Sequence, residues 1–298
     1  MLSDMKFSVL MSVYVKDNPL FFRLAVDSVF SQTMPPNEVV IVKDGRLTSE
    51  LEAICADLTK DYINIRLITL SNNVGLGLAL QYGINECHND LIARMDSDDI
   101  CLPNRFEMQL QEFAANPKLV VCGGYIREFV HKVDDGQNIR RVPIHKDDIY
   151  DFGKKRNPFN HMTVMLRKNA VISVGNYQPY YLMEDYYLWF RLMQAGADML
   201  NIPQILVNVR VGDGMYGRRG GLKYFFKEAQ LYREFYRCKY INSQELISNL
   251  AVRFVGRIIP NGLRAVAYNK LFRKTDKLYA NNRGRTHDVE SFDNGGVL

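Results

Sequence analysis

Residues 91–99 read Leu-Ile-Ala-Arg-Met-Asp-Ser-Asp-Asp, an apolar run that ends in a cluster of acids. An apolar segment of this length is typical of a strand buried on both faces, as in the parallel sheet of an α/β protein. The carboxylates of Asp96, Asp98 and Asp99 follow it directly. Acidic side chains at the carboxyl end of such a strand face the crevice in which α/β proteins bind ligands. We therefore expect an α/β fold whose functional site lies at the end of the strand at 91–95.

Strand-like and helix-like segments alternate along the first 125 residues, a pattern that predicts a parallel sheet covered by helices. We expect strands at 7–14, 38–42, 65–70, 91–95 and 119–123. We expect helices at 20–32, 49–61, 75–87 and 103–115. Beyond residue 125 the pattern predicts a mixed-sheet extension, with a polar hairpin at 129–141, a helix at 187–195 and a strand at 205–209.

The composition is that of a globular protein and excludes disordered and collagen-like classes over most of the 298 residues. Hydrophobic residues make up 47%, and 38 basic against 33 acidic side chains give a net charge of +5. The five cysteines are scattered and never spaced as CxxC, which argues against a zinc site or a disulfide framework and favours a reducing compartment. No apolar run approaches the roughly 20 residues of a membrane-spanning helix. These features predict a cytoplasmic protein.

The acidic residues at strand ends are the first candidates for chemistry. Asp96 and Asp98, one residue apart in a turn, can converge on one divalent cation, since Mg²⁺ is typically held by one or two carboxylates plus substrate phosphates. A solvated acidic turn is the alternative. Asp44 puts a carboxylate at the same sheet edge after the strand at 38–42, unless it forms an ordinary Asp-Gly turn. Asp17 follows the first strand, as a loop residue or the N-cap of the next helix.

Several segments, in this order and spacing, carry a family resemblance. They are Ser12-Val13-Tyr14, Val42-Lys43-Asp44-Gly45, Asn73-Val74-Gly75 and Asp96-Ser97-Asp98-Asp99, followed by Asn157-Pro158-Phe159-Asn160-His161 and by Glu184-Asp185 before a predicted helix. Together they resemble the metal-dependent family 2 glycosyltransferases of the GT-A fold, over residues 7 to about 212. The expected architecture is therefore a Rossmann-like mixed sheet that binds a nucleotide-diphosphate sugar.

The resemblance implies a role for each donor-site residue. Asp44 would hydrogen-bond the nucleotide base, Asp96 would contact the ribose and metal side, and Asp98 would ligate Mg²⁺ or Mn²⁺ at the diphosphate. Further candidates for the donor site, by their place in or beside these segments, are Tyr14, Asp17, Asn73, Arg94 and Ser97. Lys43 stands where a second aspartate is frequent in the family, which leaves the details of base recognition open.

Basic residues and one histidine are further candidates. Arg210, and Arg218 and Arg219 in the glycine-rich segment 212–221, can contact the diphosphate because guanidinium geometry matches phosphate. A solvated basic loop is the alternative. His161 can ligate the metal or bind diphosphate oxygens, or fill a polar position in the core.

The acidic pair before the predicted helix carries the second half of the chemistry. The resemblance implies that Asp185 is the general base that takes the proton of the acceptor hydroxyl as this oxygen attacks the anomeric carbon, in an inverting single displacement. Glu184 is the alternative base. Without the resemblance, both residues are also explained as helix N-terminal acids stabilised by the helix dipole.

The C-terminal part differs from the rest in its basic, amphipathic character. Helical spacing at 222–237, 246–259 and 263–273 places apolar residues opposite Arg and Lys. We expect a GT-A catalytic domain at 1–221, an amphipathic helical extension at 222–280 and a disordered tail at 281–298. The extension either caps the domain or lies on an anionic membrane surface, at the inner face of the plasma membrane. Nucleic-acid binding is not expected, because no recognition motif accompanies the basic patch. The oligomeric state stays open.

The sequence thus predicts a metal-dependent transferase that moves a sugar, with UDP as the commonest carrier in the family, to a saccharide or lipid-linked saccharide of bacterial surface polysaccharide synthesis. A sugar nucleotidyltransferase is disfavoured, since residues 15–19 lack its glycine- and arginine-rich loop. A non-catalytic sugar-nucleotide-binding scaffold is the other alternative. A dinucleotide-binding reading of Gly75-Leu76-Gly77 fails, because Leu80 stands in place of the third glycine.

Overall fold

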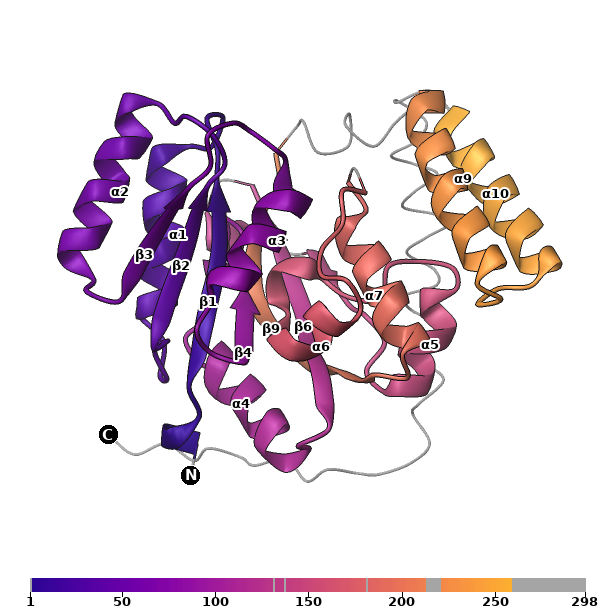
Figure 1. Cartoon of the computed structure of the whole chain (residues 1–298), viewed down its shortest axis with the longest axis horizontal. Coiled ribbons are helices and arrows are strands. Elements are labelled where there is room, and N and C mark those ends of the chain that lie inside the picture. The colour runs from indigo at the N-terminus through magenta and orange to yellow at the C-terminus, as the bar shows by residue number, and fades with distance from the viewer. Residues whose placement is uncertain (1, 131, 137, 181, 213–220, 259–298) are drawn as a thin grey trace.

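The computed structural model describes every residue except 1, 131, 137, 181, 213–220 and 259–298. Its described part forms one mixed sheet of nine strands, in the order β3-β2-β1-β4-β8-β6-β9-β5 with β7 beside β6. The strands are β1 (Phe7–Val13), β2 (Glu38–Lys43), β3 (Ile65–Thr69), β4 (Leu91–Arg94), β5 (Ile100–Cys101), β6 (Leu119–Phe129), β7 (Asn138–Arg140), β8 (Met165–Arg167) and β9 (Asp198–Arg210). Helices cover both faces of this sheet (Figure 1).

The described helices follow the strands along the chain. They are α1 (Pro19–Phe30), α2 (Ser49–Asp61), α3 (Leu76–Glu86), α4 (Arg105–Ala115), α5 (Lys146–Gly153), α6 (Lys168–Ser173), α7 (Glu184–Gln194), α9 (Gly221–Arg237) and α10 (Ser243–Ile258). The predicted alternation in the first half is confirmed, and α2 matches the predicted range residue for residue. Asn18 caps α1, its side-chain oxygen accepting from the Phe21 amide at 3.1 Å, so the N-cap role considered for Asp17 is wrong.

The parallel half of the sheet brings four strand ends to one edge. β1 lies between β2 and β4 and pairs with both in parallel, and β3 extends the sheet beyond β2. Alternate residues of β1 point to opposite faces, Val9 into a core with α1, α2 and α4 and Leu10 into a core with α3, α6 and α7. Burial on both faces explains why β1, β2 and β4 are largely apolar, whereas β3 at the edge of the sheet is only half-buried and carries Arg66 and Thr69.

The second half is the mixed extension that the sequence predicts. β8 pairs antiparallel with β4 and β6, and β6 pairs in parallel with β9. The predicted strand at 119–123 is too short, because β6 continues through two glycines to Phe129. A Cβ at Gly124 would come within 2.5 Å of the Leu206 side chain, so this glycine serves close packing and not a turn. The helix expected at 187–195 begins earlier, at Glu184 itself.

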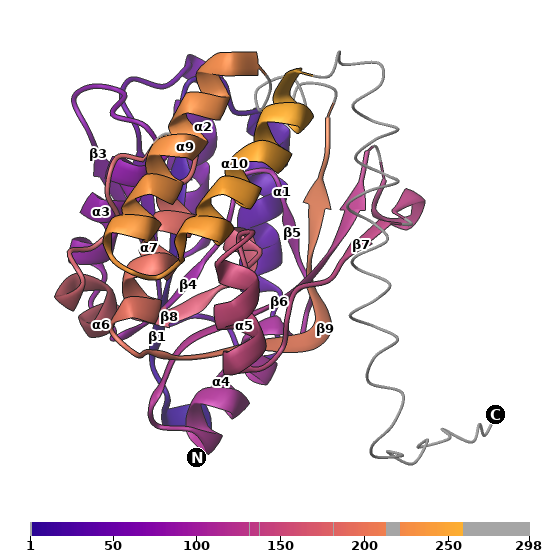
Figure 2. The same ribbon diagram turned by 90° about the vertical axis from the view of Figure 1, so that its right-hand side faces the viewer.

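The helices α9 and α10 form a hairpin beside α7 (Figures 1 and 2). A third apolar cluster joins them to α7 and comprises Met183, Tyr186, Phe190, Leu231, Tyr232, Phe235 and Ile241. The segment 263–273 and the tail 281–298 lie outside the described residues. Within the described ranges, the helices are too short or too polar to cross a membrane. All five cysteines are free; four are buried, and Cys238 in the turn of the hairpin is exposed.

Candidate active site

The acidic turn between β4 and β5 lies at the edge where the parallel strands end. Arg94, the last residue of β4, is buried, and its Nη2 forms an ion pair with Oδ1 of Asp96. Asp99 is also buried and accepts a hydrogen bond from the Arg210 backbone amide at 2.9 Å. The turn is thus fixed from below by β4 and from the side by β9. The solvated-turn alternative does not describe these contacts.

Four carboxylates gather at this turn. Asp17, from the loop after β1, accepts from the Tyr14 amide at 3.1 Å and from the Ser97 hydroxyl at 2.9 Å, which ties that loop to the turn. Burial raises the pKa of Asp17 to about 6. Burial, followed by the charges of Asp96 and Asp17, raises the pKa of Asp98 as well. The structure therefore brings together the predicted residues of the first and fourth strand ends in a site with excess negative charge.

The chemistry of this donor set suits a divalent cation that arrives with a substrate. No three His, Cys, Asp or Glu side chains of the described residues are grouped so as to hold a metal by themselves. Mg²⁺, however, typically takes one or two protein carboxylates and completes its shell with phosphates and water. The crowded carboxylates of Asp96, which is half-buried, and Asp98, which is exposed, meet that requirement, because their mutual repulsion needs a cation to offset it.

Arg210 lies beside the acidic turn, at the end of β9. Its guanidinium stacks over the rings of Phe21 and Phe129, 3.7 and 4.6 Å from their centroids, and its Nε donates to the Asp98 carbonyl at 3.3 Å. Stacking of this kind holds a guanidinium in place while leaving some of its donors available. The sequence placed Arg210 at the diphosphate, and the structure puts it next to Asp98. Arg218 and Arg219 lie outside the described residues.

Asp44 fixes the turn that opens α3. Its carboxylate accepts from the backbone amides of Val74 at 2.7 Å and Gly75 at 3.0 Å, and its carbonyl accepts from the Asn73 side chain at 3.2 Å. Gly45, with φ +85°, permits this approach, since a Cβ there would come within 2.6 Å of the Asn73 amide. The structure thus brings Asp44 and Asn73 together, and base recognition by Asp44 stays a prediction.

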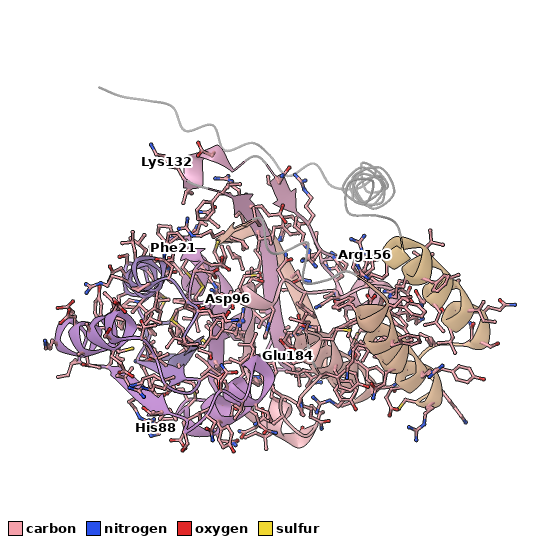
Figure 3. The ribbon with its side chains drawn as sticks, turned by 90° about the horizontal axis from the view of Figure 1, so that it is seen from above. Phe21, His88, Asp96, Lys132, Arg156 and Glu184 are labelled. Atoms are coloured by element: carbon pink, nitrogen blue, oxygen red, sulfur yellow. The ribbon has the colours of Figure 1, made fainter. Side chains whose placement is uncertain are left out.

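The acidic pair Glu184 and Asp185 opens α7, and Figure 3 shows Glu184 and Asp96 in the central part of the molecule. Asp185 accepts from the Asn157 side-chain amide at 2.6 Å, so the Asn-Pro segment orients it. Glu184 is more deeply buried, and burial, followed by the charge of Asp185, raises its pKa to about 7. Gly77 of α3 leaves room for it, because a Cβ there would meet the Glu184 Cβ at 3.0 Å.

His161 is buried in the core, against the rings of Tyr177 and of Trp189 in α7. Its Nε2 is 2.8 Å from the Tyr177 hydroxyl, and burial, followed by the charge of Arg94, lowers its pKa well below the ordinary value. A neutral imidazole bonded to a buried phenol matches the polar-core alternative for this residue. The metal-ligand role of His161 stays a prediction that this contact does not favour.

Sequence reasoning missed the buried residues that connect the two halves of the site. Tyr177 is buried, and burial raises the pKa of its hydroxyl. The charge of Arg94 on the donor side lowers this pKa, whereas the charges of Asp185 and Glu184 on the acceptor side raise it. Arg105 is buried directly beneath the acidic turn. Neither residue belongs to a local motif, so their importance arises only from the three-dimensional packing.

Known proteins share this architecture and sequence. The family model described as Glycosyl transferase family 2 matches residues 8–180. The chain is 40% identical over 269 residues to the Escherichia coli UDP-Gal:alpha-D-GlcNAc-diphosphoundecaprenol beta-1,3-galactosyltransferase, covering 90% of this chain and 97% of that protein. It is also 40% identical over 227 residues to the amylovoran biosynthesis glycosyltransferase AmsE of Erwinia amylovora, covering 76% and 84%.

Solved structures support the fold. The mannosyltransferase PcManGT from Pyrobaculum calidifontis, in complex with GDP-Man and Mn²⁺, superimposes with a TM-score of 0.60 at 13% identity, covering 93% of this chain and 85% of that chain. The GT-A architecture expected from the sequence is confirmed. The match to the family model and the 40% identity to two glycosyltransferases establish that the chain belongs to glycosyl transferase family 2.

Proposed function

We propose that the chain is a metal-dependent, inverting glycosyltransferase that moves a sugar from a nucleotide-diphosphate donor to a lipid-linked saccharide in bacterial surface polysaccharide synthesis. The observation that carries this proposal is the pair of acidic groups at one sheet edge, the turn of Asp96 and Asp98 and the acids that open α7. A donor diphosphate needs the first group, and an acceptor hydroxyl needs a proton acceptor such as the second. The names of the two 40% identical relatives support the choice of pathway.

The donor side binds and orients the nucleotide sugar. Asp96 and Asp98 would hold a divalent cation, which when bound offsets the negative charge that develops on the departing diphosphate. Arg210, whose guanidinium stacks over the rings of Phe21 and Phe129, would bind diphosphate oxygens. Because the E. coli relative is named for UDP-Gal, UDP-galactose is the first donor to test, with Mn²⁺ as the ion present in the mannosyltransferase complex.

On the acceptor side we assign the general base to Asp185. The acceptor oxygen bonds to the anomeric carbon, its proton passes to the Asp185 carboxylate, and the carbon–oxygen bond to the diphosphate breaks with its electron pair on the diphosphate. Asn157 orients the carboxylate through the 2.6 Å hydrogen bond. Glu184, which is more deeply buried, is the alternative base and otherwise shapes the floor of the site.

We further assign the α9–α10 hairpin to a membrane surface. Outward-facing apolar side chains stand along it, and they include Leu222, Phe226, Ile247, Val252, Phe254 and Val255. Exposed lysines and arginines of α9, such as Lys227 and Arg233, supply the charge that anionic lipids attract. The hairpin packs on α7 through the third apolar cluster, so it both caps the catalytic domain and would bring that domain to lipid-linked acceptors.

The decisive experiment incubates the purified chain with UDP-galactose, Mn²⁺ and a synthetic lipid diphosphate that carries N-acetylglucosamine. We expect transfer of galactose with inversion, abolished by a chelator and restored by Mn²⁺. Thermal shifts with a panel of nucleoside diphosphates give a separate readout of donor choice, since selective binding raises the melting temperature. Nucleotide binding without transfer to any lipid-linked acceptor would favour the scaffold alternative, and synthesis of a nucleotide sugar from a sugar phosphate would favour the nucleotidyltransferase.

A further inference from the structure

Arg105, the first residue of α4, is a buried charge with no ion pair. Its exposed fraction is 0%, and among the ion pairs of the described residues none involves it. A buried charge is expensive unless hydrogen bonds and nearby opposite charges compensate it. The hydrogen bonds that compensate the buried guanidinium therefore indicate what Arg105 does.

The guanidinium contacts the chain just before and just after the acidic turn. Nη2 donates to the Arg94 carbonyl at 2.7 Å, at the end of β4. Nη1 lies 3.2 Å from the Cys101 sulfur, in β5, and 3.3 Å from the Met95 sulfur. One planar group thus joins the two strands from which the turn at 96–99 projects.

A second set of contacts anchors this group to the rest of the sheet. Nε of Arg105 donates to Gln109 at 3.1 Å, one helical turn along α4. Gln109 in turn donates to the carbonyls of Cys122 at 2.7 Å, in β6, and of Thr163 at 2.9 Å. The ring of Phe106 lies 5.1 Å from the guanidinium carbon and completes its enclosure. We call this set of contacts the Arg105 clamp. Each of the three guanidinium nitrogens has a partner in it, which holds the group in one orientation.

We propose that Arg105 is a positioning residue, which holds the chain on both sides of the acidic turn so that Asp96 and Asp98 bind the donor diphosphate together with its cation. This role rests on the proposed function of the turn. Because Arg105 is fully buried, it does not touch the donor and acts through its contacts with Arg94 and Cys101, on either side of the turn.

Two substitutions separate the effect of the hydrogen bonds of Arg105 from the effect of its positive charge. Arg105→Lys keeps the charge but loses the planar fork, and Arg105→Met keeps the length of the side chain but loses both. The matched control is Arg167→Met, because Arg167 also donates to two backbone carbonyls, those of Leu119 and Pro117, and pairs with Leu91 at the opposite end of β4. If Arg105→Met does not fold, Cys101→Ala removes one partner of the clamp and leaves the charge in place.

The measurement is the binding of UDP by calorimetry at a series of Mn²⁺ concentrations, with the melting temperature of each variant recorded in parallel. For Arg105→Met we expect the Mn²⁺ concentration that supports half-maximal UDP binding to rise ten- to hundredfold, the range typical of residues that orient a metal ligand. Arg105→Lys should give an intermediate rise. Cys101→Ala should shift binding in the same direction by less. Arg167→Met should lower the melting temperature without changing the binding constants.

Two outcomes would overturn the proposal. If the Arg105 variants melt earlier but bind UDP and Mn²⁺ as the wild type does, measured where all are folded, the residue only stabilises the fold and the clamp has no role in the site. If the wild type itself binds no nucleoside diphosphate with Mn²⁺, the proposed function fails, and the clamp fails with it. The two failures are distinguishable because the first leaves wild-type binding intact.

Discussion

At the scale of a single residue, Asp98 carries a charge that lowers stability, and a role in cation binding would explain why it is there. Burial and neighbouring carboxylates raise its pKa, so the folded chain carries a charge there that it would be more stable without. We therefore expect Asp98→Asn to melt at a higher temperature than the wild type while losing Mn²⁺-dependent UDP binding and transfer. Calorimetry of unfolding and of UDP binding measures both effects. A variant that still binds and turns over with Mn²⁺ would remove Asp98 from the metal site.

Glu184 should make stability depend on pH. Its pKa is about 7 in the folded chain against an ordinary 4.5, so the folded state holds the proton more tightly than the unfolded state. The free energy of unfolding therefore falls as pH rises from about 4.5 to 7, by at most about 3 kcal/mol from this residue. In Glu184→Gln that contribution should vanish, so that the variant gains stability over the wild type as pH rises from 5 to 7.5. Urea unfolding at both pH values tests this, and parallel curves for the two proteins would refute it.

Asp185 and Glu184 can be told apart by their effects on turnover. Asp185→Asn should keep UDP binding and the hydrogen-bonding distance to Asn157 while reducing transfer by about two to four orders of magnitude, since an amide cannot accept the proton. Glu184→Gln should be far less impaired. Steady-state rates with saturating donor, alongside UDP binding constants, measure the difference. The opposite ranking would assign the base to Glu184.

At the scale of the element, helix and strand patterns predicted most of the first half because the strands there are short, largely apolar runs that alternate with helical spacing. The predicted range 119–123 ends before β6 does, because glycines in a sequence indicate a turn. In the structure Gly124 instead makes room for the side chain of Leu206, which the sequence alone does not place there. The acids of the site were predictable because they follow strands or open a helix. Arg105 and Tyr177 were not, since no local motif contains them and their roles depend on contacts, such as those with the Arg94 carbonyl and with His161, that only the folded chain shows.

The glycine in β6 gives a prediction at this scale. Gly124→Ala should destabilise the fold by about 1–3 kcal/mol, because the new methyl group would lie 2.5 Å from Leu206 in a packed core. The control is Gly256→Ala in α10, where the new methyl group meets nothing within 4 Å and helix propensity should add up to about 1 kcal/mol. Chemical denaturation of both variants provides the comparison. Equal stability of Gly124→Ala and wild type would mean that β6 and β9 can move apart.

At the scale of the whole molecule, the α9–α10 hairpin is packed against the helix that begins with the acidic pair. If its outer face meets lipid, Ile247→Ser and Phe226→Ser should weaken sedimentation with vesicles that contain phosphatidylglycerol, because each removes an exposed apolar side chain from the surface. Ile63→Ser is the control, since Ile63 is 100% exposed and lies between α2 and β3, on the opposite side of the molecule. Equal losses in all three variants, or none, would contradict the assignment.

The cysteines of this molecule offer a way to observe that surface directly. Four thiols are enclosed in the packed interior, and Cys238 stands exposed in the turn between the two hairpin helices. A thiol-reactive fluorophore would therefore attach at one place in the native chain, without engineering. Its emission on adding vesicles, donor or acceptor would show whether the hairpin turn meets lipid and whether substrates change its surroundings.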